Sequence, residues 1–241
     1  MKELLILQII AHLLADFIFQ PEKWCVEKEK NIFSKKLFFH FAIVFSCSFV
    51  LSFSFSFWWA ALLISVSHLL IDAAKNYLIQ RNRLKKYLFF IDQSLHFFII
   101  IMLTFWFVKN NGNFSFNNAL FCSTKELLVI FSLIFCIKPA NVFIKKVIES
   151  CEISKTKNNE NDESLEKAGR IIGILERILT FVLILFGQYG AVGFIFASKS
   201  ILRFRDTDSN AEAKTEYLLI GSLMSFGIAI LLGILCKEIM N

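Results

Sequence analysis

The chain has 241 residues, of which 56% are hydrophobic, and its mean hydropathy is +0.60. Such a composition, with 29 Phe and only two Pro, excludes an ordinary soluble domain. The net charge of +6 comes from short basic clusters between apolar runs, so it does not indicate nucleic-acid binding. We therefore expect an all-α, polytopic membrane protein.

Eight apolar segments follow one another along the chain, and most are as long as a helix that crosses the hydrocarbon layer. They cover residues 4–20, 37–57, 58–79, 87–108, 126–148, 170–188, 190–203 and 216–236. The seventh is short and forms a hairpin with the sixth through residues 187–190, so a count of seven is the alternative. The sequence predicts a transmembrane bundle of seven or eight helices.

Basic residues concentrate after the first, third, fifth and seventh segments, whereas the junctions between them carry little charge. The positive-inside rule then places the basic loops in the cytoplasm and both termini outside. The predicted organisation is a four-helix membrane lobe at 1–109, a connecting loop with the fifth helix at 110–149, a polar cytoplasmic linker at 150–167 and a C-terminal membrane lobe at 168–241.

The motif His-Leu-Leu-x-Asp occurs twice in the first lobe, at residues 12–16 and 68–72. The same offset of 56 residues relates His40 to His96, so it accounts for all four histidines of the chain. Asp92 and His96 form a third pair with the same spacing in reverse order. One offset for the whole set predicts that the first four helices form two repeated hairpins in parallel orientation.

Residues four apart share one face of a helix, so each pair presents an imidazole and a carboxylate to one neighbour. In the predicted orientation every Asp lies toward the cytoplasmic face, and its His lies about 6 Å deeper. His40 falls near the level of the Asp residues. Four helices then bring together one set of candidate ligands: His12, Asp16, His40, His68, Asp72, Asp92 and His96.

A charge at the centre of a membrane helix costs on the order of 3 kcal/mol, so these carboxylates are expected to be protonated, paired or bound to metal. One His–Asp pair alone is more often a helix–helix contact or a proton relay. Seven nitrogen and oxygen ligands at one depth, without a thiolate, instead favour one or two divalent metals. Zinc is the first choice, with Mn²⁺ or Fe²⁺ as alternatives.

The second lobe also carries charged residues within its apolar segments. One interpretation is an anion clamp for a phosphate headgroup beside the metal, made of Arg170, Arg177, Lys199 and Arg203. The other interpretation is structural: Glu176 and Glu216 neutralise Arg177 and Arg203, and the remaining basic side chains extend to the membrane surface.

At these residues the chain resembles an uncharacterised bacterial membrane family, domain of unknown function 3307. The resemblance covers 12–20, His40, 68–75, 92–96, 169–177, 199–204 and 216–221. It implies a multi-pass protein of the bacterial inner membrane, with no established activity. A looser similarity is to bacterial inner-membrane families of metal-dependent hydrolases, which also carry His and Asp in apolar helices.

The leading hypothesis is a metal-dependent membrane hydrolase that acts at the cytoplasmic leaflet on a lipid or polyprenyl phosphate, with Asp92 as general base. One alternative is a transporter or channel with a metal or proton relay, although the sequence predicts no polar path outward through 45–57 or 97–107. The other is a non-catalytic membrane protein with a structural metal, which docks a cytoplasmic partner. The expected partners are therefore membrane lipids and a cytoplasmic protein, and not nucleic acid.

Overall fold

The computed structural model describes all residues except 31–33, 82–85, 112–122, 152–161, 204–210 and 241, and within its helices it leaves out the side chains of 29–30, 162–168, 200–203, 211–218 and 240. Every described element is helical, as the sequence predicts. The α-helices are α1 (Lys2–Leu13), α2 (Glu22–Lys30), α3 (Lys35–Leu51), α4 (Trp58–Gln80), α5 (Leu88–Asn110), α6 (Thr124–Ile137), α7 (Pro139–Ser150), α8 (Asp162–Leu185), α9 (Tyr189–Arg203) and α10 (Ala211–Met240). A π-helical turn at Leu14–Ile18 and a 3-10 turn at Phe55–Phe57 accompany them.

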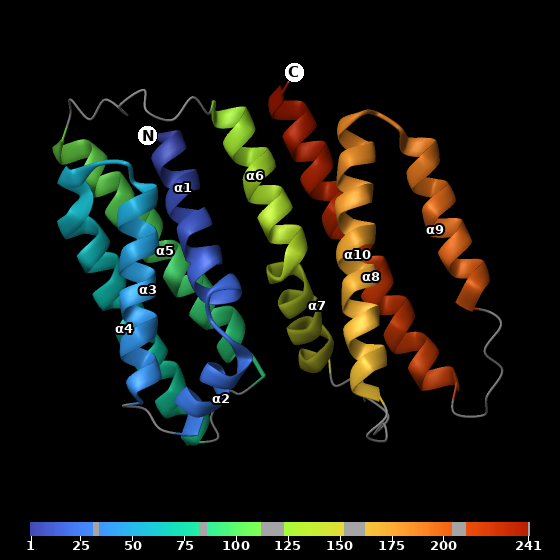
Figure 1. Cartoon of the computed structure of the whole chain (residues 1–241), viewed down its shortest axis with the longest axis horizontal. Helices are drawn as coiled ribbons and strands as arrows, with labels where there is room; N and C mark the ends of the chain where they lie inside the picture. The colour runs from blue at the N-terminus through green and yellow to red at the C-terminus, as the bar shows by residue number, and fades with distance from the viewer. Residues whose placement is uncertain (31–33, 82–85, 112–122, 152–161, 204–210, 241) are drawn as a thin grey trace. The chain divides into compact units, whose positions relative to one another are not determined.

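The chain divides into two compact units, Met1–Phe131 and Ser132–Asn241. In the first unit, α1 packs against α3 and α5, and α4 packs against the same two helices. Helices α1 and α4 run in one direction and α3 and α5 run in the other (Figure 1). The result is a four-helix bundle, and the origin of this bundle from two repeated hairpins stays a prediction.

Aromatic and small residues close one end of this bundle. Phe57 and Phe107 are fully buried, and their rings pack edge to face with centroids 4.8 Å apart. The fully buried Ala60 and Ala61 lie in the same apolar cluster. Because α4 rises 1.5 Å per residue, this closure lies about 16 Å along the helix from His68.

The bundle is polar inside and apolar outside. Phe98 on α5 and Leu70 on α4 are 61% and 63% exposed, whereas His96 and Asp72 on the same helices are buried. A soluble bundle would bury its large apolar side chains and expose its charged ones. Apolar outer faces on long helices instead indicate a membrane protein.

Three helical stretches are long and apolar enough to cross a membrane: Phe55–Gln80, Leu88–Asn110 and Leu219–Ile239. The number rises to five if two bent helix pairs each form one span: Lys2–Ile18 with Glu22–Lys28, bent by 83°, and Thr124–Ile137 with Pro139–Ser150, bent by 51°. The described residues therefore hold three to five candidate spans. Helices of 17 and 15 residues, the lengths of α3 and α9, reach about 26 and 23 Å, which is less than the hydrocarbon thickness of about 30 Å. The count of seven or eight stays a prediction.

Two prolines explain where the helices depart from the predicted segments. Pro21 follows the first segment, and the charged stretch behind it forms α2, a helix that the sequence analysis did not predict. Pro139 divides the predicted segment 126–148 into α6 and α7 and occupies the first position of α7. Proline cannot donate the helical hydrogen bond and clashes with the preceding turn, so a helix ends before it and another can begin at it.

In the second unit, α8 packs along α10, and Ile184 of α8 packs directly against Gly233 of α10. A Cβ atom on Gly233 would lie 2.6 Å from Cγ2 and 2.8 Å from Cβ of Ile184, which is a buried residue of α8. A Cβ atom on Gly227 of the same helix would meet nothing within 4 Å. Glycine is therefore required at position 233 and not at position 227.

We expect Gly233→Ala to destabilise the protein and Gly227→Ala to leave it unchanged or more stable. Alanine favours a helix by about 0.8–1.0 kcal/mol over glycine, and only at Gly233 is this gain outweighed by overpacking, which costs about 1–3 kcal/mol. Thermal unfolding of both variants in detergent micelles measures the difference. Equal melting temperatures for the two variants would contradict the close approach of α8 and α10 at Gly233.

Candidate metal centre

The four His and three Asp residues singled out by the sequence all lie inside the four-helix bundle of the first unit. Each of these side chains is 8% exposed or less. They come from every wall of the bundle: His12 from α1, Asp16 from the π-helical turn, His40 from α3, His68 and Asp72 from α4, and Asp92 and His96 from α5. The structure therefore brings the whole predicted set into one buried cluster.

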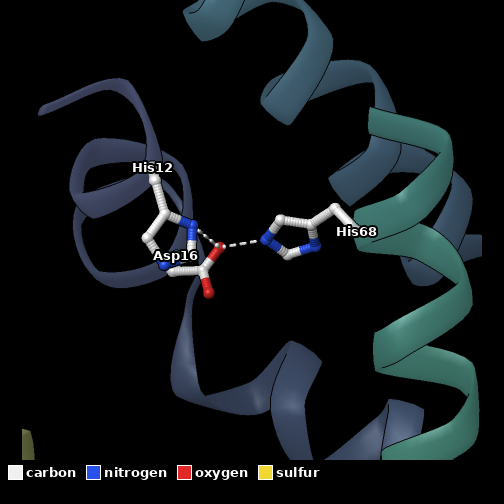
Figure 2. A group of neighbouring side chains, drawn as sticks. All are labelled: His12, Asp16 and His68. Atoms are coloured by element: carbon white, nitrogen blue, oxygen red, sulfur yellow. Dashed lines mark hydrogen bonds and ion pairs between the residues drawn. The ribbon is translucent and has the colours of Figure 1, made fainter. Parts of the chain in front are cut away.

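The carboxylate of Asp16 is the centre of one half of this cluster. Its Oδ1 atom lies 2.9 Å from Nε2 of His68, 3.4 Å from Nε2 of His40 and 3.8 Å from Nδ1 of His12. Figure 2 shows His12 and His68 reaching this oxygen from two different helices. Ligands about 2.0–2.1 Å from a tetrahedral zinc stand about 3.3 Å from one another. The separations around Asp16 bracket that value.

A local change of helix register places Asp16 at this centre. The amide of Phe19 donates to the carbonyl of Leu14 at 2.8 Å, five residues back, so the helix widens into a π-helical turn. Such turns are rare and occur often at functional sites. The four-residue spacing of His12 and Asp16 is visible in the sequence, whereas this widening of the helix is not.

Gln93 on α5 contacts three members of the cluster. Its Oε1 atom lies 3.2 Å from Nε2 of His12, while its Nε2 atom donates to Oδ2 of Asp16 at 3.3 Å and to Oδ2 of Asp92 at 3.2 Å. Because an amide oxygen only accepts, this contact favours a proton on Nε2 of His12 and leaves Nδ1 with a free lone pair. Outer partners of this kind orient metal ligands.

Two lysines hold the other half of the cluster, and neither was predicted from the sequence as part of the site. Lys28 of α2 is buried, and its ammonium group lies 2.6 Å from Oδ2 of Asp72. Lys75 lies 3.0 Å from Oδ1 of Asp72 and 3.0 Å from Oδ2 of Asp92. Lys75 could have been predicted from the sequence, because it follows Asp72 by three residues on the same helix. Lys28 could not, because its contact with Asp72 depends on the position of α2.

Six polar side-chain atoms of the cluster are buried without a hydrogen-bond partner. They are Nδ1 of His12, Nδ1 and Nε2 of His40, Oδ1 of Asp92, and Nδ1 and Nε2 of His96. A buried polar group without a partner costs about 1–3 kcal/mol. The ring of His68 stacks on that of His96, with centroids 3.8 Å apart. Hydrogen-bonding capacity in this part of the bundle is therefore not fully used.

Three overlapping groups have ligand atoms within 4.8 Å of one another and could hold a metal ion. They are His12, Asp16 and His68; His40, His68 and Asp72; and Asp72, Asp92 and His96. The carboxylates of the second and third groups are held by ammonium groups. Asp16 meets only imidazoles and one amide, so the first group is the most available for a metal.

The predicted residues of the second lobe lie in the second unit. The guanidinium of Arg177 is buried and donates to the carbonyl of Cys136 at 2.8 Å, to Oδ1 of Asn141 at 2.6 Å and to Oγ of Ser225 at 2.9 Å. Glu176 pairs with Lys199, and Arg170 is exposed. The side chains of Arg203 and Glu216 lie outside the described residues. Anion binding by the second lobe stays a prediction.

Fold and cluster together define a helical membrane protein with a buried His/Asp site. Residues 4–122 match the family model described as Protein of unknown function (DUF3307), and through this N-terminal half the chain belongs to that family. The match includes the whole cluster, Gln93 and both lysines. It ends before the second unit, so the resemblance seen there remains a prediction. Comparison with the curated proteins and with the solved structures gives no match.

We expect Asp72→Asn to lower the free energy of unfolding by about 3–5 kcal/mol, because it leaves the buried ammonium of Lys28 without its carboxylate. Glu149→Gln removes one partner of the exposed Lys146–Glu149 pair and should change stability by less than about 1 kcal/mol. Chemical unfolding in mixed micelles, followed by circular dichroism, compares the two. Similar small losses in both variants would argue against a buried Lys28–Asp72 pair.

Proposed function

We propose that this chain is a metal-dependent hydrolase of the bacterial inner membrane, with a divalent metal, zinc first, held by His12, Asp16 and His68. The observation that carries the proposal is the spacing of imidazole nitrogens around Oδ1 of Asp16. Three protein ligands with a further position open to water or substrate are typical of catalytic zinc sites. His40, whose Nε2 atom lies 3.4 Å from the same oxygen, adjoins these three ligands, and the fourth position is left open. Mn²⁺ or Fe²⁺ would suit the same nitrogen and oxygen donors.

The proposed substrate is a lipid or polyprenyl phosphate at the cytoplasmic leaflet. When bound, the metal would polarise a phosphoryl group and make its water more acidic. Asp92 is the proposed general base, since its Oδ1 atom is buried without a hydrogen-bond partner while Oδ2 is held by Lys75 and Gln93. Gln93 keeps Nδ1 of His12 free to act as a ligand.

The proposed topology keeps seven or eight membrane segments, with both termini outside and the Asp side of the cluster toward the cytoplasm. The alternating directions of α1, α3, α4 and α5 support it (Figure 1). So does the position of Lys28 and Lys75 on the Asp side of the histidines, since basic residues concentrate at the cytoplasmic end of membrane helices. Membrane lipids and a cytoplasmic protein remain the proposed partners.

A second candidate function is a carrier with a proton or metal relay, and buried polar residues above the cluster favour it. Gln8 exchanges two hydrogen bonds with Ser48, at 3.1 and 2.6 Å, and the hydroxyl of Thr104 is buried without a partner. Ser48 and Thr104 lie in the two stretches, 45–57 and 97–107, for which the sequence predicted no polar path, and the absence of a path stays a prediction. The buried apolar side chains of Val44 and Ile100 nevertheless interrupt the polar residues along α3 and α5.

We expect the purified wild type to carry about one divalent metal per chain, and His68→Ala or Asp16→Asn to lose it. The matched control is Gln8→Leu, which replaces a buried polar residue of α1 outside the cluster and should keep the metal. Elemental mass spectrometry gives the metal content, and thermal unfolding shows whether each variant is folded. Wild type without stoichiometric metal, after growth and purification with zinc or manganese, would refute the proposal.

We expect metal-dependent release of phosphate from a polyprenyl phosphate or from phosphatidic acid in mixed micelles. Asp92→Asn should slow it by about 100-fold or more, because loss of a general base typically costs 10²–10⁴-fold. Glu149→Gln, an exposed acid of the second unit, is the control and should keep full activity.

The same preparations in proteoliposomes separate hydrolysis from transport. Metal or proton uptake without phosphate release, abolished by Asp72→Asn, would replace the hydrolase proposal by the carrier. Metal that stays bound without either activity would point to a structural metal.

A further inference from the structure

The two lysines of the cluster differ in kind from its other members, because they are the cations already present in it. Lys28 comes from α2, and its ammonium group contacts Oδ2 of Asp72. After the amide of Gln20 is turned to its favoured orientation, the amide oxygen accepts from the same ammonium group at 2.5 Å. Lys75 bridges Asp72 and Asp92 at 3.0 Å to each. Both ammonium groups therefore stand on the Asp side of the histidine cluster.

From this arrangement we propose that Lys28 and Lys75 form an anion subsite that binds the phosphate group of a phosphate monoester when the metal is bound. This inference rests on the proposed metal centre and names the group that the substrate presents to it. Each ammonium group has three donors, so it could donate to a phosphate oxygen and keep its carboxylate partner. Lysine suits this role because it binds phosphate as a point charge with three donors.

Charge balance argues for an anion in the metal-loaded site. With neutral imidazoles, three carboxylates and two ammonium groups give the cluster one net negative charge. A divalent metal would change this to one net positive charge, and a low-dielectric interior penalises an uncompensated charge strongly. A phosphate monoester carries about −1.5 to −2 at neutral pH, so its binding would remove this positive charge and return the site to about the charge of the metal-free cluster. A carboxylate or a phosphodiester, with one negative charge, would neutralise the site as well, so the net charge calls for an anion and the donors of the two ammonium groups favour phosphate.

Access to the cluster favours the same subsite. The side chain of Lys75 is 25% exposed, whereas those of the His and Asp residues are 8% exposed or less. Lys28 lies on a short helix that is bent by 83° from α1 and is exposed at Lys23, Val26 and Glu27. An anion that approaches from this end meets Lys75 before any carboxylate. The exposure thus places Lys75 nearer the surface than the candidate metal ligands, while the buried Lys28 contacts the same carboxylate of Asp72.

The test uses the full chain in detergent, with metal content and anion binding read separately. Inorganic phosphate is titrated by calorimetry into metal-loaded and metal-free protein. We expect binding only to the metal-loaded protein, and a loss of about tenfold or more in affinity in Lys75→Gln and in Lys28→Gln, each with metal retained. Lys23→Gln, which changes an exposed lysine of α2, is the matched control and should bind phosphate as wild type does.

The outcomes separate the two ideas. Protein that holds metal but binds no phosphate, or binds it equally well in both lysine variants, would overturn the subsite and leave the metal centre standing. Protein that holds no metal would overturn the metal centre, and the subsite with it. Lys75 is partly exposed, so Lys75→Gln keeps the test decisive if Lys28→Gln does not fold. A second experiment compares binding to vesicles of phosphatidic acid with binding to vesicles of phosphatidylcholine. Binding to the phosphatidic acid vesicles alone would identify a lipid headgroup as the ligand, in place of free phosphate.

Discussion

The need to compensate three carboxylates inside an apolar bundle determines how the first unit is assembled. Each of Asp16, Asp72 and Asp92 finds at least one counter-group on another helix, so no pair of helices can satisfy them alone. A one-turn shift of any wall would leave a buried charge unpaired, which typically costs several kcal/mol. Apolar contacts between lipid-facing helices are weakly selective. The polar cluster therefore fixes the register of the four helices.

Two local departures from regular helix make this assembly possible. The π-helical turn rotates Asp16 relative to the helix above it, so that its carboxylate faces three histidines. The break before Pro21 then turns the chain by 83° and sends α2 across the bundle end, where Lys28 reaches Asp72. Both departures lie within a few residues of the cluster. One positions the carboxylate of Asp16, and the other brings Lys28 to the carboxylate of Asp72. The irregular backbone and the buried charge thus belong to one arrangement.

Much of this site was predictable, because four-residue spacing and one repeated offset depend only on regular helix geometry. These rules placed seven residues from four helices together without any knowledge of tertiary contacts. These rules failed for residues whose local sequence does not reveal their tertiary contacts. Lys28 stands among charged residues typical of a solvated loop, and only its contact with Asp72 reveals a buried role. Arg177 was expected to meet an acid or an anion, but backbone carbonyl and neutral side-chain oxygens accept from it.

The two copies of the His-Leu-Leu-x-Asp motif have come to hold their carboxylates in opposite ways. Asp16 faces imidazoles with free lone pairs, whereas Asp72 is held by two ammonium groups. The position that corresponds to Lys75 in the first copy is Phe19, which is half exposed. A structural polar core would favour complete satisfaction on both sides, because a partly satisfied network is less stable than an apolar one. The asymmetry supports the proposal that a metal binds on the side of Asp16 and an anion on the side of the two lysines, as a metal-dependent phosphoryl transfer would need.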